Sequence, residues 1–145
     1  MLDYWNSKRK GLGPPVRSSF DPILEKPWLT PYMFIYETVN NVRDLRLRLI
    51  GTQIVELFGS DPTGQCLSEF WVPEEFESML ASYQRSVKTG QPFAIKGSYY
   101  WKDRGYIDWY CVICPLKVKA DHVEQFLGIL CPSPAYNRIL AIGSY

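Results

Sequence analysis

The stretch LRLRLIGT, residues 45–52, carries the clearest structural pattern in the chain. Leucine and arginine alternate over its first five residues, which is the two-residue period of a strand with one buried face and one face in water. Gly51 ends this strand, and Thr52 is suited to cap a helix. That helix carries apolar residues at helical spacing over residues 52–58 and stops at Gly59, because glycine adopts a left-handed conformation at little cost.

A longer helix is predicted from Pro73 to just before Gly90. Proline suits the first helical position, and Glu74 and Glu75 complement the helix dipole there. The helix has a single apolar stripe, which favours packing on a sheet. The stripe consists of Phe76, Met79, Leu80, Tyr83 and Val87.

Four further strands are predicted, over residues 33–39, 92–102, 106–118 and 123–132. Asp103-Arg104-Gly105 is typical of a tight hairpin turn. The chain thus has two strands, then a helical middle, then three strands joined by short loops. This order indicates an α+β fold with a five-stranded antiparallel sheet and its helices on one face. Alternation assigns two sets to the core side: Phe93, Ile95, Tyr99 and Trp101, and Ile107, Trp109, Cys111 and Ile113.

The chain divides into three parts. Residues 1–32 contain a short apolar helix signal and many prolines and glycines, so we expect an N-terminal helical and extended arm that caps the core. Residues 33–132 form the core domain. Residues 133–145 form a C-terminal tail, with Ser133 as the cap of a short helix.

Composition narrows the class of protein. A chain of 145 residues is the usual size of one domain. A net charge of +1 gives no global field for nucleic acid. Neither a signal peptide nor an apolar run of membrane-spanning length is present, so we expect a cytoplasmic protein with no membrane contact and four free thiols.

The segment 48–52, followed by Glu56, Gly59, Asp61 and Gly64, resembles the single-domain bacterial PAS family common in alphaproteobacteria. The order of the predicted elements is also that of a PAS domain. The resemblance covers nearly the whole chain. It implies a five-stranded antiparallel sheet, helices over one face, often a pocket between them, and a role in signalling through a small molecule, a dimer contact or a partner protein.

Aromatic residues make up 15% of the chain, which favours either a lined pocket or a densely filled core. Both alternatives place the same side chains between the sheet and the long helix. Flat aromatic rings with polar tips suit a small apolar or aromatic ligand. The predicted ligand-binding residues are Leu57, Phe58, Trp71, Phe76, Leu80, Tyr83, Tyr99, Trp101 and Trp109.

The sequence indicates no metal site, and it does not show whether the protein binds a cofactor. Haem needs an axial ligand, and the only histidine, His122, is expected in an exposed loop. The residues around Cys66 do not match the photoreactive motif of light-sensing PAS relatives. Cys111 and Cys114 have CxxC spacing, but residues three apart on a strand point to opposite faces, so they are expected to be inert thiols.

The other face of the sheet is predicted to carry Phe34, Tyr36, Tyr100, Tyr106 and Tyr110. That is a large aromatic surface, which the arm or a second subunit must cover. We therefore expect a homodimer.

The sequence contains no catalytic signature around any serine or cysteine. We also expect that no kinase, cyclase or DNA-binding domain follows it. We expect a non-catalytic sensory or regulatory module that acts through a small ligand, a separate signalling protein, or both. The alternatives are a small α+β enzyme, which would need paired His/Asp or Tyr/Asp side chains in its pocket, and a purely structural dimerisation unit. Asp108 is expected to point away from the pocket.

Overall fold

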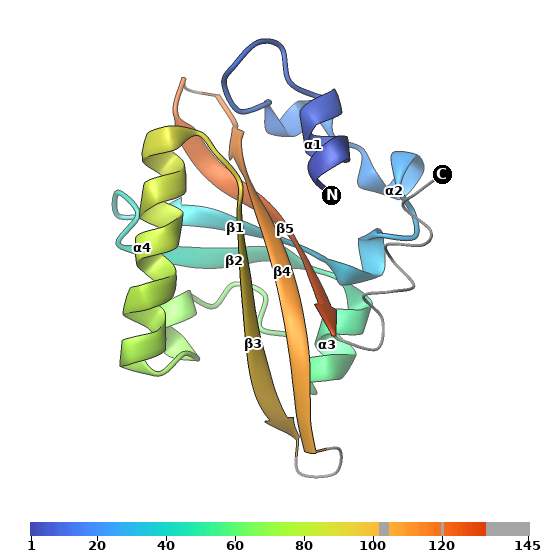
Figure 1. Cartoon of the computed structure of the whole chain (residues 1–145), viewed down its shortest axis with the longest axis vertical. Coiled ribbons are helices and arrows are strands. Elements are labelled where there is room, and N and C mark those ends of the chain that lie inside the picture. Colours follow the sequence, from blue (N-terminus) through green and yellow to red (C-terminus); the bar gives the residue numbers. More distant parts are fainter. Residues whose placement is uncertain (102–104, 120, 133–145) are drawn as a thin grey trace.

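The computed structural model describes residues 1–101, 105–119 and 121–132, and the side chains of all of these except residues 99–101. Within this part, five strands form one antiparallel sheet in the order β2-β1-β5-β4-β3, shown in Figure 1. The central strands are therefore β1, β5 and β4. The strands are β1 (Met33–Val39), β2 (Asp44–Ile50), β3 (Phe93–Trp101), β4 (Gly105–Lys117) and β5 (Val123–Pro132).

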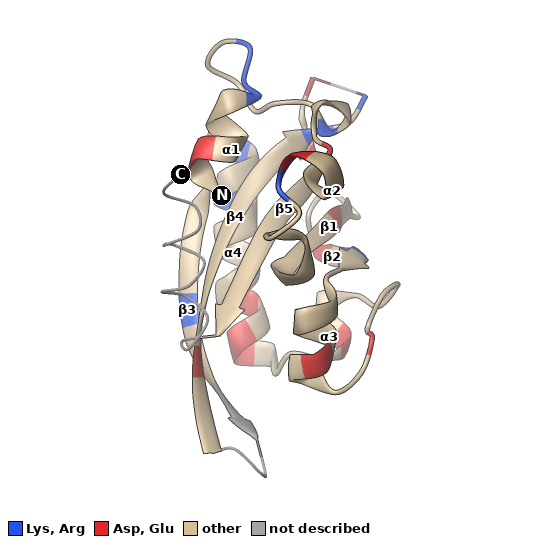
Figure 2. Ribbon diagram, turned by 90° about the vertical axis from the view of Figure 1, so that its right-hand side faces the viewer, with Lys and Arg blue, Asp and Glu red and all other residues tan. Residues whose placement is uncertain are grey.

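Helices lie on both sides of this sheet. The α-helices are α1 (Leu2–Ser7), α2 (Pro22–Glu25), α3 (Thr52–Phe58) and α4 (Pro73–Thr89). Three single turns of 3₁₀-helix occupy Arg17–Ser19, Thr30–Tyr32 and Leu67–Glu69. Figure 2 shows α1 and α2 in front of the sheet and α4 behind it.

The predicted fold class is confirmed, and so are the predicted strand over residues 33–39 and the helices after Gly51 and from Pro73. Gly59 and Gly90 end α3 and α4 with φ angles of 75° and 67°, in the left-handed region that glycine tolerates. Thr52 is the first residue of α3, and Gly51 occupies the capping position in its place. Residues 103–104 of the predicted turn and the predicted tail 133–145 lie outside the described residues.

The leucine-arginine alternation in β2 is interrupted. Ile35 pairs with Leu49 and Tyr36 pairs with Leu47, so Arg48 is an extra residue, as in a β-bulge. Leu47 is buried, but Leu49 is 43% exposed. The prediction that Leu49 shares the buried face is therefore wrong. Because the bulge reverses the alternation beyond it, Ile50 turns toward the core instead.

The central part of the sheet is buried on both faces. The face toward α3 and α4 carries one hydrophobic cluster, which includes Leu45, Ile113 and Phe126. The opposite face carries a second cluster, in which Tyr4 and Trp5 from the N-terminal segment pack on strand residues. The strand members of this second cluster are Met33, Ile35, Cys114, Leu116, Leu127, Ile129 and Cys131.

The N-terminal segment is attached to the sheet by polar contacts as well as apolar ones. The Trp5 side chain is 1% exposed, and its Nε1–H donates a hydrogen bond of 2.8 Å to the carbonyl oxygen of Pro115 in β4. The backbone N–H of Lys117 donates to the carbonyl oxygen of Pro15 at 3.0 Å. Within the arm, Glu25 accepts hydrogen bonds from Tyr4 and Lys8, which lower the pKa of Glu25 to about 2. The arm therefore packs on the sheet as an ordered layer.

Trp5→Ala should lower the free energy of unfolding by about 3–5 kcal/mol, because it empties a large buried site and leaves the Pro115 carbonyl without its donor. Urea denaturation measures this change. The matched control is Trp28→Ala, which truncates a tryptophan that is 36% exposed and should cost much less. Equal losses for the two variants would show that the arm does not support the sheet.

Candidate functional site

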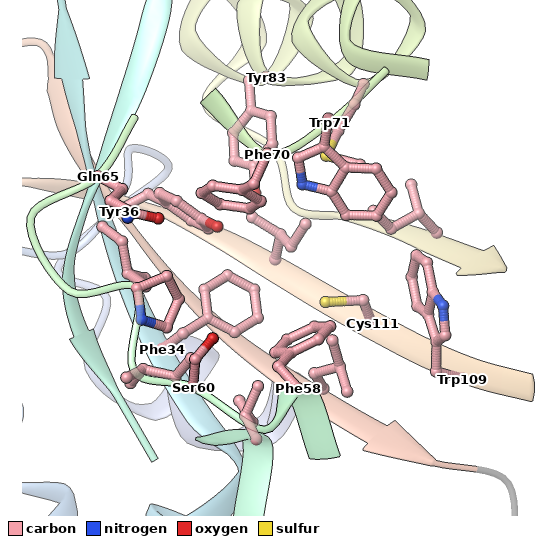
Figure 3. A pocket seen from close by; sticks show the side chains of 18 residues that line it. Phe34, Tyr36, Phe58, Ser60, Gln65, Phe70, Trp71, Tyr83, Trp109 and Cys111 are labelled. Carbon is pink, nitrogen blue, oxygen red and sulfur yellow. The ribbon is translucent and has the colours of Figure 1, made fainter. Parts of the chain in front are cut away.

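A cavity of about 220 Å³ lies between the sheet and the layer formed by α3, α4 and the loops beside them. Figure 3 shows side chains from both layers converging on it. Among the described residues, eighteen line the cavity: Phe34, Tyr36, Leu47, Ile50, Ile54, Phe58, Ser60, Pro62, Gln65, Phe70, Trp71, Met79, Tyr83, Ile95, Trp109, Cys111, Ile113 and Leu130. The described core on this side of the sheet is thus not completely filled.

Two pairs of glycine and aromatic residues shape the floor of the cavity. Phe34 in β1 lies directly opposite Gly128 in β5, and Trp109 in β4 lies directly opposite Gly97 in β3. A Cβ atom on Gly128 would come within 2.1 Å of the Phe34 ring, and one on Gly97 within 2.4 Å of the Trp109 ring. Each ring therefore rests on bare backbone, which is a known use of glycine in strands.

Helices and loops supply the roof and the mouth. Met79 and Tyr83 come from α4, and Phe58 from the end of α3. The loop between α3 and α4 is fastened to the edge strand β2. Gln65, which lines the mouth, accepts from the Leu47 backbone N–H at 3.0 Å, and the Gly64 N–H donates to the Leu47 carbonyl oxygen at 2.8 Å. These bonds hold the loop in place beside the opening.

The described lining of the cavity is apolar. Within the part of the chain that the structure describes, none of the lining residues is Lys, Arg, His, Asp or Glu. Burial raises the pKa of the phenols of Tyr36 and Tyr83 and of the thiol of Cys111, so all three stay protonated. The site can therefore hold a neutral ring and offer it O–H donors.

The structure brings four of the nine predicted ligand-binding residues to the cavity: Phe58, Trp71, Tyr83 and Trp109. Leu57 is buried in the neighbouring core, and Phe76 packs against that core without lining the cavity. Leu80 is half-buried and does not line the cavity. The side chains of Tyr99 and Trp101 lie outside the described part. The role of the nine predicted residues in ligand binding stays a prediction.

Phe34 and Tyr36 were predicted on the outer face of the sheet, and this prediction is wrong. Both side chains line the cavity on the inner face, while Met33 and Ile35 belong to the outer cluster. The cause is that β1 is a central strand covered on both sides, so its two faces are equally apolar and alternation does not distinguish them. In the sequence, Gly128 inside a strand was a signal that a large ring approaches the backbone closely there.

As predicted, Tyr106 and Tyr110 lie on the outer face, where their side chains are 77% and 38% exposed. Asp108 is exposed on the same side and accepts a hydrogen bond from Ser98. The side chain of Tyr100 lies outside the described part. His122 is exposed, and its Nε2 lies 3.6 Å from Oε1 of Glu124. These placements agree with the predicted outward position of Asp108 and the predicted loop position of His122.

The cysteines also lie as predicted from strand geometry. Cys111 belongs to the inner cluster and Cys114 to the outer one, so their sulfurs lie on opposite faces of β4. Cys66 begins the 3₁₀ turn before α4 and does not line the cavity. Among the described residues, no group of three His, Cys, Asp or Glu side chains is arranged to hold a metal ion.

The sequence model of the PAS domain family matches residues 1–131. The match spans most of the chain, and the chain therefore belongs to the PAS domain family. Its fold is that of a sensory module. The comparison with curated proteins gave no match.

Solved structures agree with this family. A light-oxygen-voltage domain studied with a flavin analogue has a TM-score of 0.58 at 15% identity, over 86% of this chain and 94% of that one. The PAS domain of a protein from Colwellia psychrerythraea has a TM-score of 0.55 at 14% identity, over 77% and 97%. The light state of the blue-light photoreceptor aureochrome1 domain has a TM-score of 0.53 at 12% identity, over 85% and 96%. Such low identities show a shared fold and no more.

None of the helices in the described ranges is both long enough and apolar enough to span a bilayer.

Gly128→Ala should lower the free energy of unfolding by about 1–3 kcal/mol, because the added methyl group collides with the Phe34 ring. Urea denaturation measures the loss. Combining it with Phe34→Leu should cost less than the sum of the two single changes, since the smaller side chain leaves room for the methyl group. Gly13→Ala, whose added atom meets only the Lys117 Nζ at 3.9 Å, is the control and should change stability by under about 0.5 kcal/mol. A neutral Gly128→Ala would contradict the described packing.

Proposed function

We propose that this PAS domain is a non-catalytic sensor that binds a small apolar or aromatic ligand in the inner cavity and passes the signal to a separate protein in the cytoplasm. The observation that carries the proposal is the apolar cavity between the sheet and the layer of α3 and α4. Protein interiors rarely keep voids larger than a water molecule, so a cavity of about 220 Å³ lined by aromatic rings suggests an occupant.

The size of the cavity limits the ligand. An engineered cavity of about 150 Å³ is known to bind benzene, whereas pockets for drug-sized ligands measure about 300–1,000 Å³. At about 220 Å³, this cavity suits a molecule with one or two rings. A flavin has three fused rings and a long side chain and needs more room. The flavin of the light-oxygen-voltage neighbour is therefore not part of the proposal.

Strand β1 offers a route for the signal. On one face, Phe34 and Tyr36 line the cavity, and on the other face, Met33 and Ile35 contact the layer formed by the arm. A ligand that binds one arrangement of this strand more tightly than another shifts the population between them. The arm and the outer face of the sheet then change together.

We further propose that the protein is a homodimer and that the outer face of β4 forms the contact. Tyr106 and Tyr110 are exposed there, beyond the part of the sheet that packs on the arm residues. Tyrosine combines a large apolar ring with a polar tip, which makes it common at interfaces between proteins. A second copy of the chain is the occupant that we assign to this surface.

Native mass spectrometry of freshly purified protein, together with calorimetric titration of indane, tests the ligand. We expect the wild-type protein to retain a small molecule or to bind indane. Cys111→Phe should abolish both, because the new ring fills the cavity beside Trp109. Ala94→Phe adds the same ring at an exposed position on β3 that does not line the cavity, and it should keep binding. Wild-type protein that retains no molecule and binds no indane would refute the ligand.

The same mass spectra report the number of subunits. Wild-type protein should be a dimer, and the double variant Tyr106→Glu/Tyr110→Glu should be monomeric, because two carboxylates would have to be desolvated in the contact. Leu12→Glu adds one carboxylate at a side chain in the arm that is 91% exposed, and it should leave the dimer intact. A monomeric wild-type protein would exclude the proposed contact while leaving the ligand site unaffected.

A further inference from the structure

Two phenol groups face the cavity from opposite layers of the protein. Tyr36 belongs to β1 in the sheet, and Tyr83 belongs to α4 in the roof. Their ring centroids are 6.2 Å apart, and the ring planes meet at 74°. Figure 3 shows both side chains extending into the space beside Phe70. The two hydroxyls thus lie on one side of the cavity.

Edge-to-face contacts fix both rings. The Tyr83 ring packs against Phe126 at 4.8 Å and Phe93 at 5.1 Å, and the Tyr36 ring packs against Phe34 at 5.4 Å. Such contacts favour one orientation of each ring. The direction of each C–O bond is therefore set before a ligand enters, and little conformational entropy is lost on binding.

Neither hydroxyl forms a hydrogen bond with any residue in the described part of the chain, although Tyr83 is only 1% exposed. No described side-chain oxygen or nitrogen is both sealed in packed protein and unpaired. The two hydroxyl oxygens must therefore border open space, and the cavity that both tyrosines line supplies it. An unpaired polar group in an apolar site costs free energy, which a suitable ligand atom removes.

The charge of the ligand follows from the same lining. Among the described residues that line the cavity, no lysine, arginine or histidine is present to pair with an anion, and no carboxylate is present to pair with a cation. Transferring an unpaired ion into such a site is strongly unfavourable. A neutral ligand avoids this penalty. Phenols are good hydrogen-bond donors, and the two indole groups in the lining, Trp71 and Trp109, can only donate.

We propose that the ligand is a neutral compound of one or two rings with an oxygen or nitrogen acceptor, such as a ring ketone, and that Tyr36 and Tyr83 select it by donating hydrogen bonds to that acceptor. This inference rests on the proposed function, because it requires that the cavity binds a ligand. It adds the chemical class of the ligand and the residues that recognise it.

Calorimetric titration with 1-indanone and indane tests the inference, since the two probes share a skeleton and differ in one carbonyl group. Wild-type protein should bind 1-indanone about tenfold more tightly than indane, the effect of one or two net hydrogen bonds. Indole, which has an N–H donor and no comparable acceptor, should bind more weakly than 1-indanone. Tighter binding of indole would overturn the proposed acceptor.

In the double variant Tyr36→Phe/Tyr83→Phe, the tenfold preference should fall to about one, while indane should bind at least as tightly as before. Tyr32→Phe, at a tyrosine that packs against the outer cluster and does not line the cavity, is the matched control and should keep the preference. The melting temperature without ligand should not fall in the double variant, because no hydrogen bond within the protein is lost. A clear fall in melting temperature would show that the hydroxyls have a structural role and would overturn the inference.

The outcomes separate the two proposals. If wild-type protein binds both probes equally, or if the double variant keeps the preference, the tyrosines do not select the ligand although the cavity still binds rings. If neither probe binds, the cavity is not a ligand site, and both proposals fail.

Discussion

Burial of the central strands on both faces is the constraint on which the rest of this structure depends. Strands β1, β5 and β4 lie between α3 and α4 on one side and the N-terminal arm on the other. Because the arm closes the outer face with Tyr4, Trp5 and Phe20, apolar residues can line both faces of these strands. The inner face then needs no complete filling to keep the sheet folded, and a cavity is tolerated there.

Local sequence was sufficient to predict the elements and the fold class. The turn chemistry at Gly51, Gly59, Pro73 and Gly90 marks where helices begin and end, and these signals act within a few residues. The opposite orientation of Cys111 and Cys114 also followed from strand geometry alone. The resemblance to the PAS family rests on the same segment, so fold and family were predicted together.

The faces of individual strands were harder to predict, for physical reasons. In β1, Phe34 and Ile35 are both buried, so no polar partner shows which one faces the cavity. In β2, the bulge at Arg48 depends on pairing with β1, a contact between segments that a local pattern does not contain. The cavity itself reflects the sum of many side-chain volumes, and alternation says nothing about volume. Phe34 and Tyr36, which were predicted on the wrong face, lie where these two difficulties meet.

The tryptophans at the cavity have an optical consequence. Trp71, just before α4, and Trp109 in β4 have ring centroids 6.3 Å apart and planes inclined at 65°. Indole rings held this close in a fixed, asymmetric arrangement couple their electronic transitions, which gives a signal in circular dichroism. Because one ring belongs to the roof and the other to the sheet, any change in the spacing of the two layers alters that signal. The circular dichroism of these two tryptophans therefore reports the spacing between the sheet and the layer above the cavity.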